Sequence, residues 1–510
     1  MLSFNPLDYN FYPKLIQDYL VGNTALKDFY TFESSIQGIV EATKKRQFDA
    51  EKRKVLVDEL TRQYEGVDIV GAVSENIKLL HSENTFTITT GHQLGIFTGP
   101  LYTLYKVMTV ISHCKKMKAK IPDKNFIPVF WLASEDHDLE EIQSIDLFGK
   151  KQSWQTIQKG AVGRMDCEGL PELLQHIRIL FANDAKALEW ISEMEIAYQS
   201  KTLSSATRKI VHRLFGDYGL VIIDADSPVL KEQFVEVMKQ DICERKFEPI
   251  IQNQTEKLGQ HYKTQVNPRP INFFYLNANN RERITDDATF DEIRKPENIV
   301  ANPENYSPNV CMRPMYQECI LPNVCYVGGP SEIAYWLQLK EAFIAANISF
   351  PVLLVRNSVA LFQPNKTAQI EMLGLEPIDF LEEEKKITQK YMKLQLGEIT
   401  FDTEINATSE AIESIKKQLK SIDLTLLPQA DLIQKNMKEA ILNLQKKIEK
   451  VRMQKYEQAL SKISKLRAEL FPNNIPQERV SNLLSVIAFF DKQALLQAFE
   501  NSNEKGFLVC

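Results

Sequence analysis

Short apolar runs alternate along residues 84–365 with longer segments in which apolar residues recur at helical spacing. The runs are rich in β-branched and aromatic residues, which favour strands. We expect strands at Thr85–Thr90, Ile127–Ala133, Leu220–Asp224, Cys325–Val327 and Pro351–Val355. Strands that alternate with helices are typical of an α/β domain with a parallel sheet. Residues 248–312 interrupt this alternation with asparagines, prolines and short β-like pieces, which indicates an inserted subdomain.

The chain before and after this core has a different pattern. Residues 1–83 are charged and helical in pattern, so we expect an N-terminal helical segment. Asp431–Leu470 contains no Gly or Pro, and its apolar residues follow the spacing of four and three that is typical of a coiled coil. The spacing slips once beyond its middle, and Ile405–Leu419 is the expected antiparallel partner. We therefore predict an α-helical antiparallel coiled coil within residues 366–472, followed by short helices over 473–510.

The composition limits the classes of protein. The chain has 510 residues, enough for two or three domains, and 61 basic against 67 acidic side chains give a net charge of -6. This balance gives no general attraction to nucleic acid or to a membrane, and no apolar run is long enough to span a bilayer. Seven scattered cysteines without a CxxC pair disfavour a disulfide framework or a structural zinc site. Without a secretion signal, we expect a soluble cytoplasmic protein.

The segment Thr89–Pro100 has the strongest functional pattern. It joins a predicted strand to a predicted helix over Leu101–Lys118, with Thr98 as cap and Pro100 in the first turn. Free amide groups and the dipole at such a helix start attract anions. The candidate binding residues of the turn and of the helix are Gly91, His92, Gln93, Gly95, Thr98, Gly99, Tyr102 and Lys106. The turn matches neither GxxxxGK[ST] nor GxGxxG, and the alternative is a tight structural connection.

A second candidate site directly follows the strand Ile127–Ala133. The run Ser134-Glu135-Asp136-His137-Asp138 places three carboxylates and an imidazole past the carboxyl end of that strand, where parallel sheets bind ligands. The group could hold Mg²⁺, orient an amine or set the protonation of the histidine, and Asp136 and His137 are the best candidates. The alternative is a helix start with Ser134 as cap, and both can hold together. Zinc fits less well, because no second pair of ligands at i, i+4 spacing is present.

Polar residues also follow the other predicted strands. Gly328 and Gly329 precede a helix for which Ser331 is the expected cap, and Arg313 could bind a carboxylate or phosphate through two hydrogen bonds. The carboxyl ends of parallel strands meet at one edge of a sheet, so these groups could line the same cleft. The further binding candidates are Asp224, Asp226, Gln317, Glu332, Tyr335, Arg356 and Asn357. A plain structural role at a strand end is the alternative for each of them.

Together these motifs resemble the family of bacillithiol biosynthesis cysteine-adding enzymes, which are cysteine ligases. The matched stretches, in order, are TTGHQLGIFTGPLYTLYK (89–106), IPVFWLASEDHDLEEI (127–142), GLVIIDAD (219–226) and RPMYQECILPNVCYVGGPSEIAYWLQLK (313–340). FPVLLVRNS (350–358) and the long helix after it also fit, so the resemblance covers most of the chain. His92 departs from the pattern, because glutamine is the residue that we expect there in the family.

The resemblance implies a Rossmann-like core similar to that of class I aminoacyl-tRNA synthetases, with inserted segments, and a homodimer formed through the coiled coil. It also implies the last step of bacillithiol synthesis, in which the carboxyl group of cysteine forms an amide with the amine of glucosaminyl-malate. Ligases commonly activate such a carboxylate with ATP, so we expect an adenine nucleotide, which Mg²⁺ could accompany.

The resemblance also suggests roles for the candidate residues. His92 and the helix start after it could stabilise phosphate charge in the transition state. Asp136, His137 or Asp138 could deprotonate the sugar ammonium, since only the free amine attacks. Arg313 could hold the malyl carboxylates.

Two other classes of protein remain open. One is another enzyme on the same core, such as a nucleotidyl transferase or a metal-assisted hydrolase that uses the acids of residues 135–138 and needs no cysteine. The other is a coiled-coil scaffold whose core merely binds a nucleotide. Polar clusters at three strand ends favour an enzyme, because they have no purpose in coiled-coil pairing.

Overall fold

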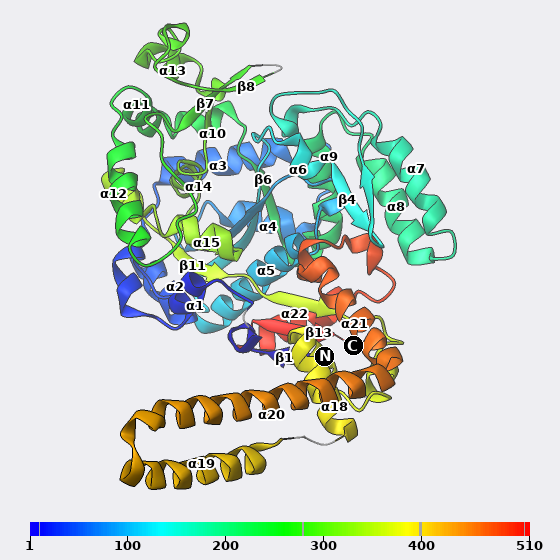
Figure 1. The fold of residues 1–510 in the computed structure, drawn as a ribbon. Helices are drawn as coiled ribbons and strands as arrows, with labels where there is room; N and C mark the ends of the chain where they lie inside the picture. Colours follow the sequence, from blue (N-terminus) through cyan, green and yellow to red (C-terminus); the bar gives the residue numbers. More distant parts are fainter. Residues whose placement is uncertain (10, 278–279, 397–399, 504, 510) are drawn as a thin grey trace. The chain divides into compact units, whose positions relative to one another are not determined.

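The computed structural model describes residues 1–9, 11–277, 280–396, 400–503 and 505–509. The chain forms two compact units, the first with residues 1–361 and 475–509 and the second with residues 362–474 (Figure 1). Within the described ranges, no helix combines the length and the hydropathy of a membrane span.

A five-stranded parallel sheet lies at the centre of the first unit, in the order β11-β10-β2-β3-β6. Its strands are β2 (Thr85–His92), β3 (Asn125–Leu132), β6 (Val221–Asp224), β10 (Asn323–Gly328) and β11 (Val352–Val355). All five predicted strands are confirmed, and their ends differ from the prediction by one or two residues. The chain adds β3 and β6 on one side of β2 and later adds β10 and β11 on the other. The strand order therefore reverses at β2, and open parallel sheets bind ligands at the carboxyl ends beside such a reversal.

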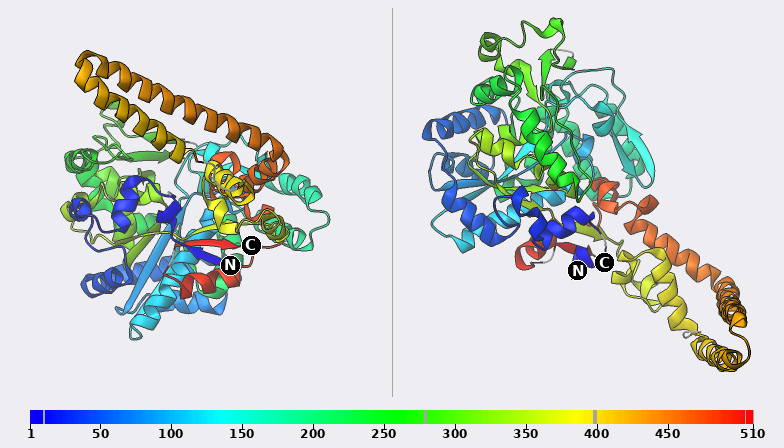
Figure 2. Two further views of the ribbon diagram at one scale, coloured as in Figure 1. Left: turned by 60° about the horizontal axis from the view of Figure 1, so that its bottom comes forward. Right: turned by 60° about the vertical axis from the view of Figure 1, so that its left-hand side comes forward.

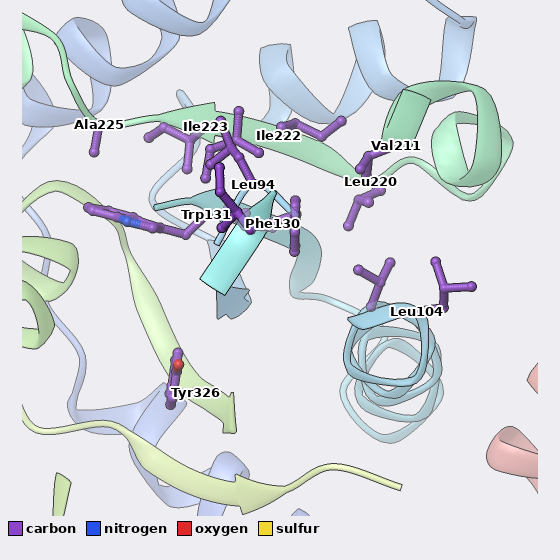
Figure 3. Close-up of a cluster of buried hydrophobic side chains, with 14 of the residues drawn as sticks. Leu94, Leu104, Phe130, Trp131, Val211, Leu220, Ile222, Ile223, Ala225 and Tyr326 are labelled. Carbon is purple, nitrogen blue, oxygen red and sulfur yellow. The ribbon is translucent and has the colours of Figure 1, made fainter. Parts of the chain in front are cut away.

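Helices cover both faces of the sheet. On one face, α2 (Ile36–Lys45) and α5 (Tyr102–Lys120) bury apolar side chains in a cluster with β2, β10 and β11. A larger cluster joins β3 and β6 to α5 and to α9 (Leu203–Phe215), and Figure 3 shows Leu104, Phe130, Val211 and Ile222 within it. Each fully buried side chain of this size contributes roughly 1.5–3 kcal/mol. The sheet is therefore a rigid base for the residues at its strand ends.

The other elements of the first unit surround this sheet. The N-terminal part contains β1 (Leu2–Phe4), α1 (Lys14–Leu20), α3 (Ala50–Gln63) and α4 (Gly71–Leu79). Between β3 and α9 lie α6 (Leu139–Ile142), β4 (Ser144–Leu147), β5 (Lys150–Ser153), α7 (Leu170–Leu180) and α8 (Ala185–Ala197). After β6 come α10 (Pro228–Glu232), α11 (Val235–Ile242), α12 (Phe247–Gly259), α14 (Arg313–Ile320), α15 (Pro330–Trp336) and α16 (Lys340–Ala345).

The segment between α12 and α14 contains a separate three-stranded antiparallel sheet, in the order β8-β7-β9. Its strands are β7 (Phe273–Asn277), β8 (Asn280–Arg283) and β9 (Tyr306–Pro308), and α13 (Pro296–Ala301) lies between the last two in sequence. Figure 2 shows this small sheet beyond one edge of the main sheet, within the same unit.

Residues 475–509 return to the first unit. They contain α22 (Lys492–Asn501) and β13 (Gly506–Val509), which pairs with β1 and with β12 (Ser358–Leu361). We expected only helices over residues 473–510, and this prediction is wrong for Gly506–Val509, which form a strand. A four-residue apolar run has too little periodicity to distinguish a strand from a helix end, and only its two neighbours define it.

The second unit is helical, with α17 (Thr367–Glu371), α18 (Glu384–Leu396), α19 (Asp402–Ile422), α20 (Leu427–Lys455) and α21 (Glu457–Leu470). The long helices α19 and α20 run antiparallel and lie side by side in every view of Figures 1 and 2, as predicted. The helix expected over Asp431–Leu470 is divided into α20 and α21 at Tyr456, where the apolar spacing slips.

Candidate functional site

A cavity of about 640 Å³ lies at the carboxyl ends of β2, β3 and β10. This volume is typical of a small-molecule site. Thirteen predicted site residues line it, namely Gly91, His92, Gln93, Tyr102, Lys106, Glu135, Asp136, Arg313, Gly329, Ser331, Glu332, Tyr335 and Arg356. The amide of Gln93 donates to Asp136 Oδ2 at 2.9 Å, so the first two predicted motifs meet directly.

Lys106 and Glu332 connect the ends of β2 and β10. Lys106 Nζ lies 2.6 Å from Glu332 Oε2 and donates to the carbonyl of Gly91 at 2.8 Å. The backbone N–H of Gly329 donates to Glu332 at 2.7 Å, and α15 begins after Gly329. The prediction that Ser331 caps this helix is therefore wrong, because Glu332 reaches back to the first amide. Burial lowers the pKa of Lys106, and the nearby Lys106 charge holds the pKa of Glu332 below its usual value despite burial.

His92 ends β2 and is uncharged at neutral pH. Burial, and then the charge of Lys106, lowers its pKa to about 3. Its ring meets that of Tyr102 edge to face, with the centroids 5.0 Å apart. A neutral imidazole can form a hydrogen bond with a ligand but cannot supply positive charge. Any stabilisation of phosphate by His92 would thus be through a hydrogen bond.

The turn after His92 is closed by the C-terminal part of the first unit. Asn482 Nδ2 donates to the carbonyls of Phe97 and Gly99 at 2.9 and 2.7 Å, and the N–H of Leu101 donates to Ser481. The helix begins at Tyr102 without a side-chain cap, so the prediction that Thr98 caps it is wrong. Three predicted residues of this turn, Gly95, Thr98 and Gly99, do not line the cavity.

The residues of the acidic segment after β3 lie in different surroundings, and only some of them line the cavity. The carboxylate of Asp136 faces the cavity, and the hydrogen bond from Gln93 with the charge of Arg281 outweighs burial and lowers its pKa. Asp138 caps α6 by accepting from the N–H of Glu141, so Ser134 is not the cap. His137 does not line the cavity; its side chain is 47% exposed, and its Nδ1 lies 3.0 Å from Arg281 Nη1.

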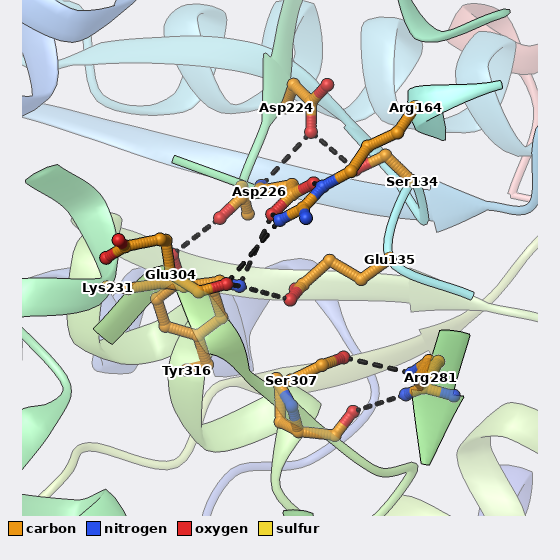
Figure 4. A network of polar contacts seen from close by, with 12 residues as sticks. Ser134, Glu135, Arg164, Asp224, Asp226, Lys231, Arg281, Glu304, Ser307 and Tyr316 are labelled. Carbon is orange, nitrogen blue, oxygen red and sulfur yellow. Dashed lines mark hydrogen bonds and ion pairs between the residues drawn. The ribbon is translucent and has the colours of Figure 1, made fainter. Parts of the chain in front are cut away.

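A buried network of charges lies behind Glu135 (Figure 4). Lys231 Nζ is 2.6 Å from Glu135 Oε1 and 3.3 Å from Asp226, which also pairs with Arg164 at 2.6 Å. Asp224 accepts from the hydroxyl groups of Ser134 and Ser204. Asp224 and Asp226 therefore support the wall of the cavity without lining it.

Arg313 begins α14 and points into the cavity. Its Nη1 donates to Gln317 Oε1 at 3.1 Å, and the Gln317 amide donates in turn to Glu318 at 2.8 Å. Among the described residues, no carboxylate lies within 4.0 Å of the Arg313 guanidinium. Its charge is thus available to an anionic ligand. Gln317 supports Arg313 from behind, and Gln317, Gly328 and Asn357 do not line the cavity.

Several cationic and acidic residues of the cavity were not predicted from the sequence. These are Arg269, Arg281, Arg283, Glu478 and Arg479, and together with the predicted residues they give seven cationic and four acidic lining side chains. Arg281 and Arg283 come from β8, and alternate residues of a strand share a face. Their spacing is the one local signal in the sequence that the two arginines lie together. Arg356 and Glu478 form a buried ion pair of 2.7 Å. In the described part of the chain, no three His, Cys, Asp or Glu side chains form a cluster that could hold a metal ion.

Comparison with known proteins agrees with this architecture. The family model for the N-terminal Rossmann-like domain of bacillithiol biosynthesis BshC matches residues 2–357, and the model for its C-terminal coiled-coil domain matches residues 359–507. A Flavobacterium psychrophilum protein named "Putative cysteine ligase BshC" is 37% identical over 492 residues, which cover 93% of this chain and 92% of that protein. Proteins of the same name from Flavobacterium johnsoniae and Cytophaga hutchinsonii are 38% and 35% identical, and each match covers at least 92% of both chains. The chain therefore belongs to the bacillithiol biosynthesis BshC family.

Proposed function

We propose that this protein is a ligase that joins the carboxyl group of cysteine to the amine of glucosaminyl-malate through an amide bond, as the last step of bacillithiol biosynthesis. The observation that carries the proposal is the cavity at the reversal of the strand order, with its excess of cationic side chains. A sugar malate bears two carboxylates, so a cationic cavity of this size suits it. The names of the relatives point to cysteine as the second substrate.

Arg313 is the proposed anchor for the malyl carboxylates. Its planar guanidinium is held by Gln317 on one side and by the hydroxyl of Tyr335 at 3.5 Å on the other. Two neutral partners fix its direction without cancelling its charge. A fixed and uncompensated arginine can bind a carboxylate through two hydrogen bonds at little cost in side-chain entropy.

Activation of the cysteine carboxylate by an adenine nucleotide is part of the proposal. Arg269, Arg283 and Arg479 line the cavity and are exposed, and among the described residues no carboxylate lies within ion-pair distance of them. Such guanidinium groups fit phosphate oxygens, and Mg²⁺ would accompany the nucleotide. The nucleotide would supply the leaving group that makes the carboxylate reactive toward an amine. The likeness to class I aminoacyl-tRNA synthetases is an analogy of fold and carries no residue role.

We also propose that two chains form a homodimer through the coiled coil and that the enzyme acts in the cytoplasm, where a reducing environment keeps thiols free. Support for the dimer comes from α20, on which Met437, Leu444 and Val451 recur every seven residues and are 39%, 53% and 59% exposed. Apolar side chains in such a row on a long helix are stabilised by a partner helix.

The proposed reaction is tested by the thiol profile of a strain that lacks the gene. We expect loss of the cysteinyl product and accumulation of glucosaminyl-malate. The wild-type gene should restore the profile and Arg313→Met should not, whereas Arg178→Met, a variant of an arginine outside the cavity, should restore it. A deletion strain with an unchanged thiol profile would contradict the proposal.

A further inference from the structure

The four acidic side chains of the cavity differ in how many hydrogen-bond and ion-pair partners their carboxylate oxygens have. Glu332 binds Lys106, the hydroxyl of Tyr326 and the N–H of Gly329. Glu478 binds Arg356 and the N–H of Val359. Asp136 accepts from Gln93 and from the N–H of His137. These three carboxylates are held by strong donors, which stabilise the ionised form and make it a weak base.

Glu135 is different. Lys231 contacts its Oε1 from behind the wall, at 2.6 Å, while its Oε2 has no partner among the described residues. The side chain is only 13% exposed, and it lines the cavity. A carboxylate with one fixed and one free oxygen in a substrate cavity is suited to accept a proton.

On these contacts we propose that Glu135 is the general base that takes a proton from the ammonium group of the amine substrate, with Lys231 as its positioning residue. This assignment rests on the proposed function. It replaces the expectation that Asp136, His137 or Asp138 is the base. Asp138 caps a helix, His137 contacts Arg281 without lining the cavity, and Asp136 is held by two donors.

The network behind Glu135 explains how it can be both ionised and basic. Burial raises the pKa of Glu135, and the charge of Lys231 opposes this rise. Lys231 is completely buried and is shared with Asp226, whose charge is also compensated by Arg164 (Figure 4). The Lys231 amine also donates to the carbonyl of Glu304 at 3.0 Å, so its position is fixed.

The proposed step balances in protons and electrons. One ammonium proton moves to Oε2 of Glu135, which leaves a lone pair on the nitrogen. This pair forms the N–C bond to the acyl carbon of the activated carboxylate, an acyl phosphate or acyl adenylate. The bond from that carbon to the phosphate oxygen breaks, and the phosphate leaves with the electron pair. The second proton of the new nitrogen centre passes to solvent.

The test compares two amines with the purified full-length enzyme, cysteine and ATP. Glucosaminyl-malate is charged at neutral pH and needs a base, whereas hydroxylamine is already uncharged and does not. For Glu135→Gln we expect kcat with the sugar to fall by roughly 100-fold or more, with a KM change of only a few-fold, because a positioned base contributes about 10²–10⁴. The formation of cysteine hydroxamate from hydroxylamine should fall far less. Glu140→Gln, a change at an exposed carboxylate on α6, is the matched control.

Two further variants separate catalysis from folding. Glu135→Asp should recover part of the lost rate, because it keeps the carboxylate. Lys231→Met should move the acidic limb of the pH profile of kcat/KM to higher pH, because the lysine charge lowers the pKa of Glu135.

Each failure has a distinct meaning. A wild-type enzyme that makes no amide would overturn the proposed function and this assignment with it. An active wild type with an equally active Glu135→Gln variant would overturn the assignment alone. Equal losses with both amines would show that Glu135 supports structure or binding and is not the base.

Discussion

The buried ion pair between Arg356 and Glu478 allows a quantitative prediction. It connects the end of β11 to the C-terminal part of the first unit, and both side chains line the cavity. The exposed fractions are 5% and 6%, and Glu478 also accepts from the N–H of Val359 at 3.1 Å. We consider three variants, which are Arg356→Met, Glu478→Leu and the double substitution.

The magnitude follows from the burial of the two charges. Removal of one partner leaves the other charge buried without compensation, which costs about 3–5 kcal/mol in the free energy of unfolding. Unfolding of a unit of roughly 400 residues has an entropy of about 0.8 kcal/mol/K, so each single variant should melt about 4–6 °C below the wild type. The double variant removes both charges of this pair and loses mainly the hydrogen bond to Val359, which costs about 1 kcal/mol and thus about 1 °C.

Thermal unfolding followed by near-ultraviolet circular dichroism measures these differences, with all four proteins at one concentration and pH. The decisive result is the recovery in the double variant. Single variants that melt within 1 °C of the wild type would contradict a buried ion pair, since the pair would then be either solvated or absent. A double variant that loses the sum of both single losses would refute it as well, because the two charges would not interact.

Three further predictions concern other parts of the chain. Asn482→Ala should lower the free energy of unfolding by about 2–3 kcal/mol, because two buried carbonyls lose their donor; unchanged urea unfolding would contradict this. Burial lowers the pKa of His92 to about 3, so below pH 6.5 the unfolded chain binds a proton that the folded chain does not, and stability falls as the pH falls. Between pH 7 and pH 5 the His92→Gln variant should therefore lose less free energy of unfolding than the wild type, by up to about 2 kcal/mol. Equal losses for the two proteins in urea unfolding would contradict the lowered pKa of His92. Leu444→Lys should convert a dimer to a monomer in light scattering, and a monomeric wild type would contradict the proposed dimer.

The sequence predicts the sheet and part of the site for a clear physical reason. Buried parallel strands such as Ile127–Ala133 are continuous apolar runs, and the polar residues after them must meet at one edge. The segment around His92 and the segment around Asp136 were therefore expected at one cavity, and the contact between Gln93 and Asp136 confirms this.

What the sequence could not predict depends on contacts between distant segments. Thr98 has the residue type of a helix cap, but the turn that contains it is held by Asn482, almost 400 residues away in sequence. Glu478 reaches the cavity from the C-terminal part, and no spacing in the sequence indicates it. Arg281 comes from the inserted sheet, and its spacing from Arg283 shows only that the two share a face, not that this face lines the cavity. The distinct environments of Glu135 and Asp136, which are neighbours in sequence, likewise arise from Lys231 and Gln93.

A crystal structure of the protein with glucosaminyl-malate would test most directly where the sugar binds and which carboxylate faces its amine. We expect the sugar in the cavity at the ends of β2, β3 and β10, with the malyl carboxylates on Arg313 and the ammonium nitrogen about 3 Å from Glu135 Oε2. A sugar bound elsewhere, or one whose amine faces away from Glu135, would contradict this expectation.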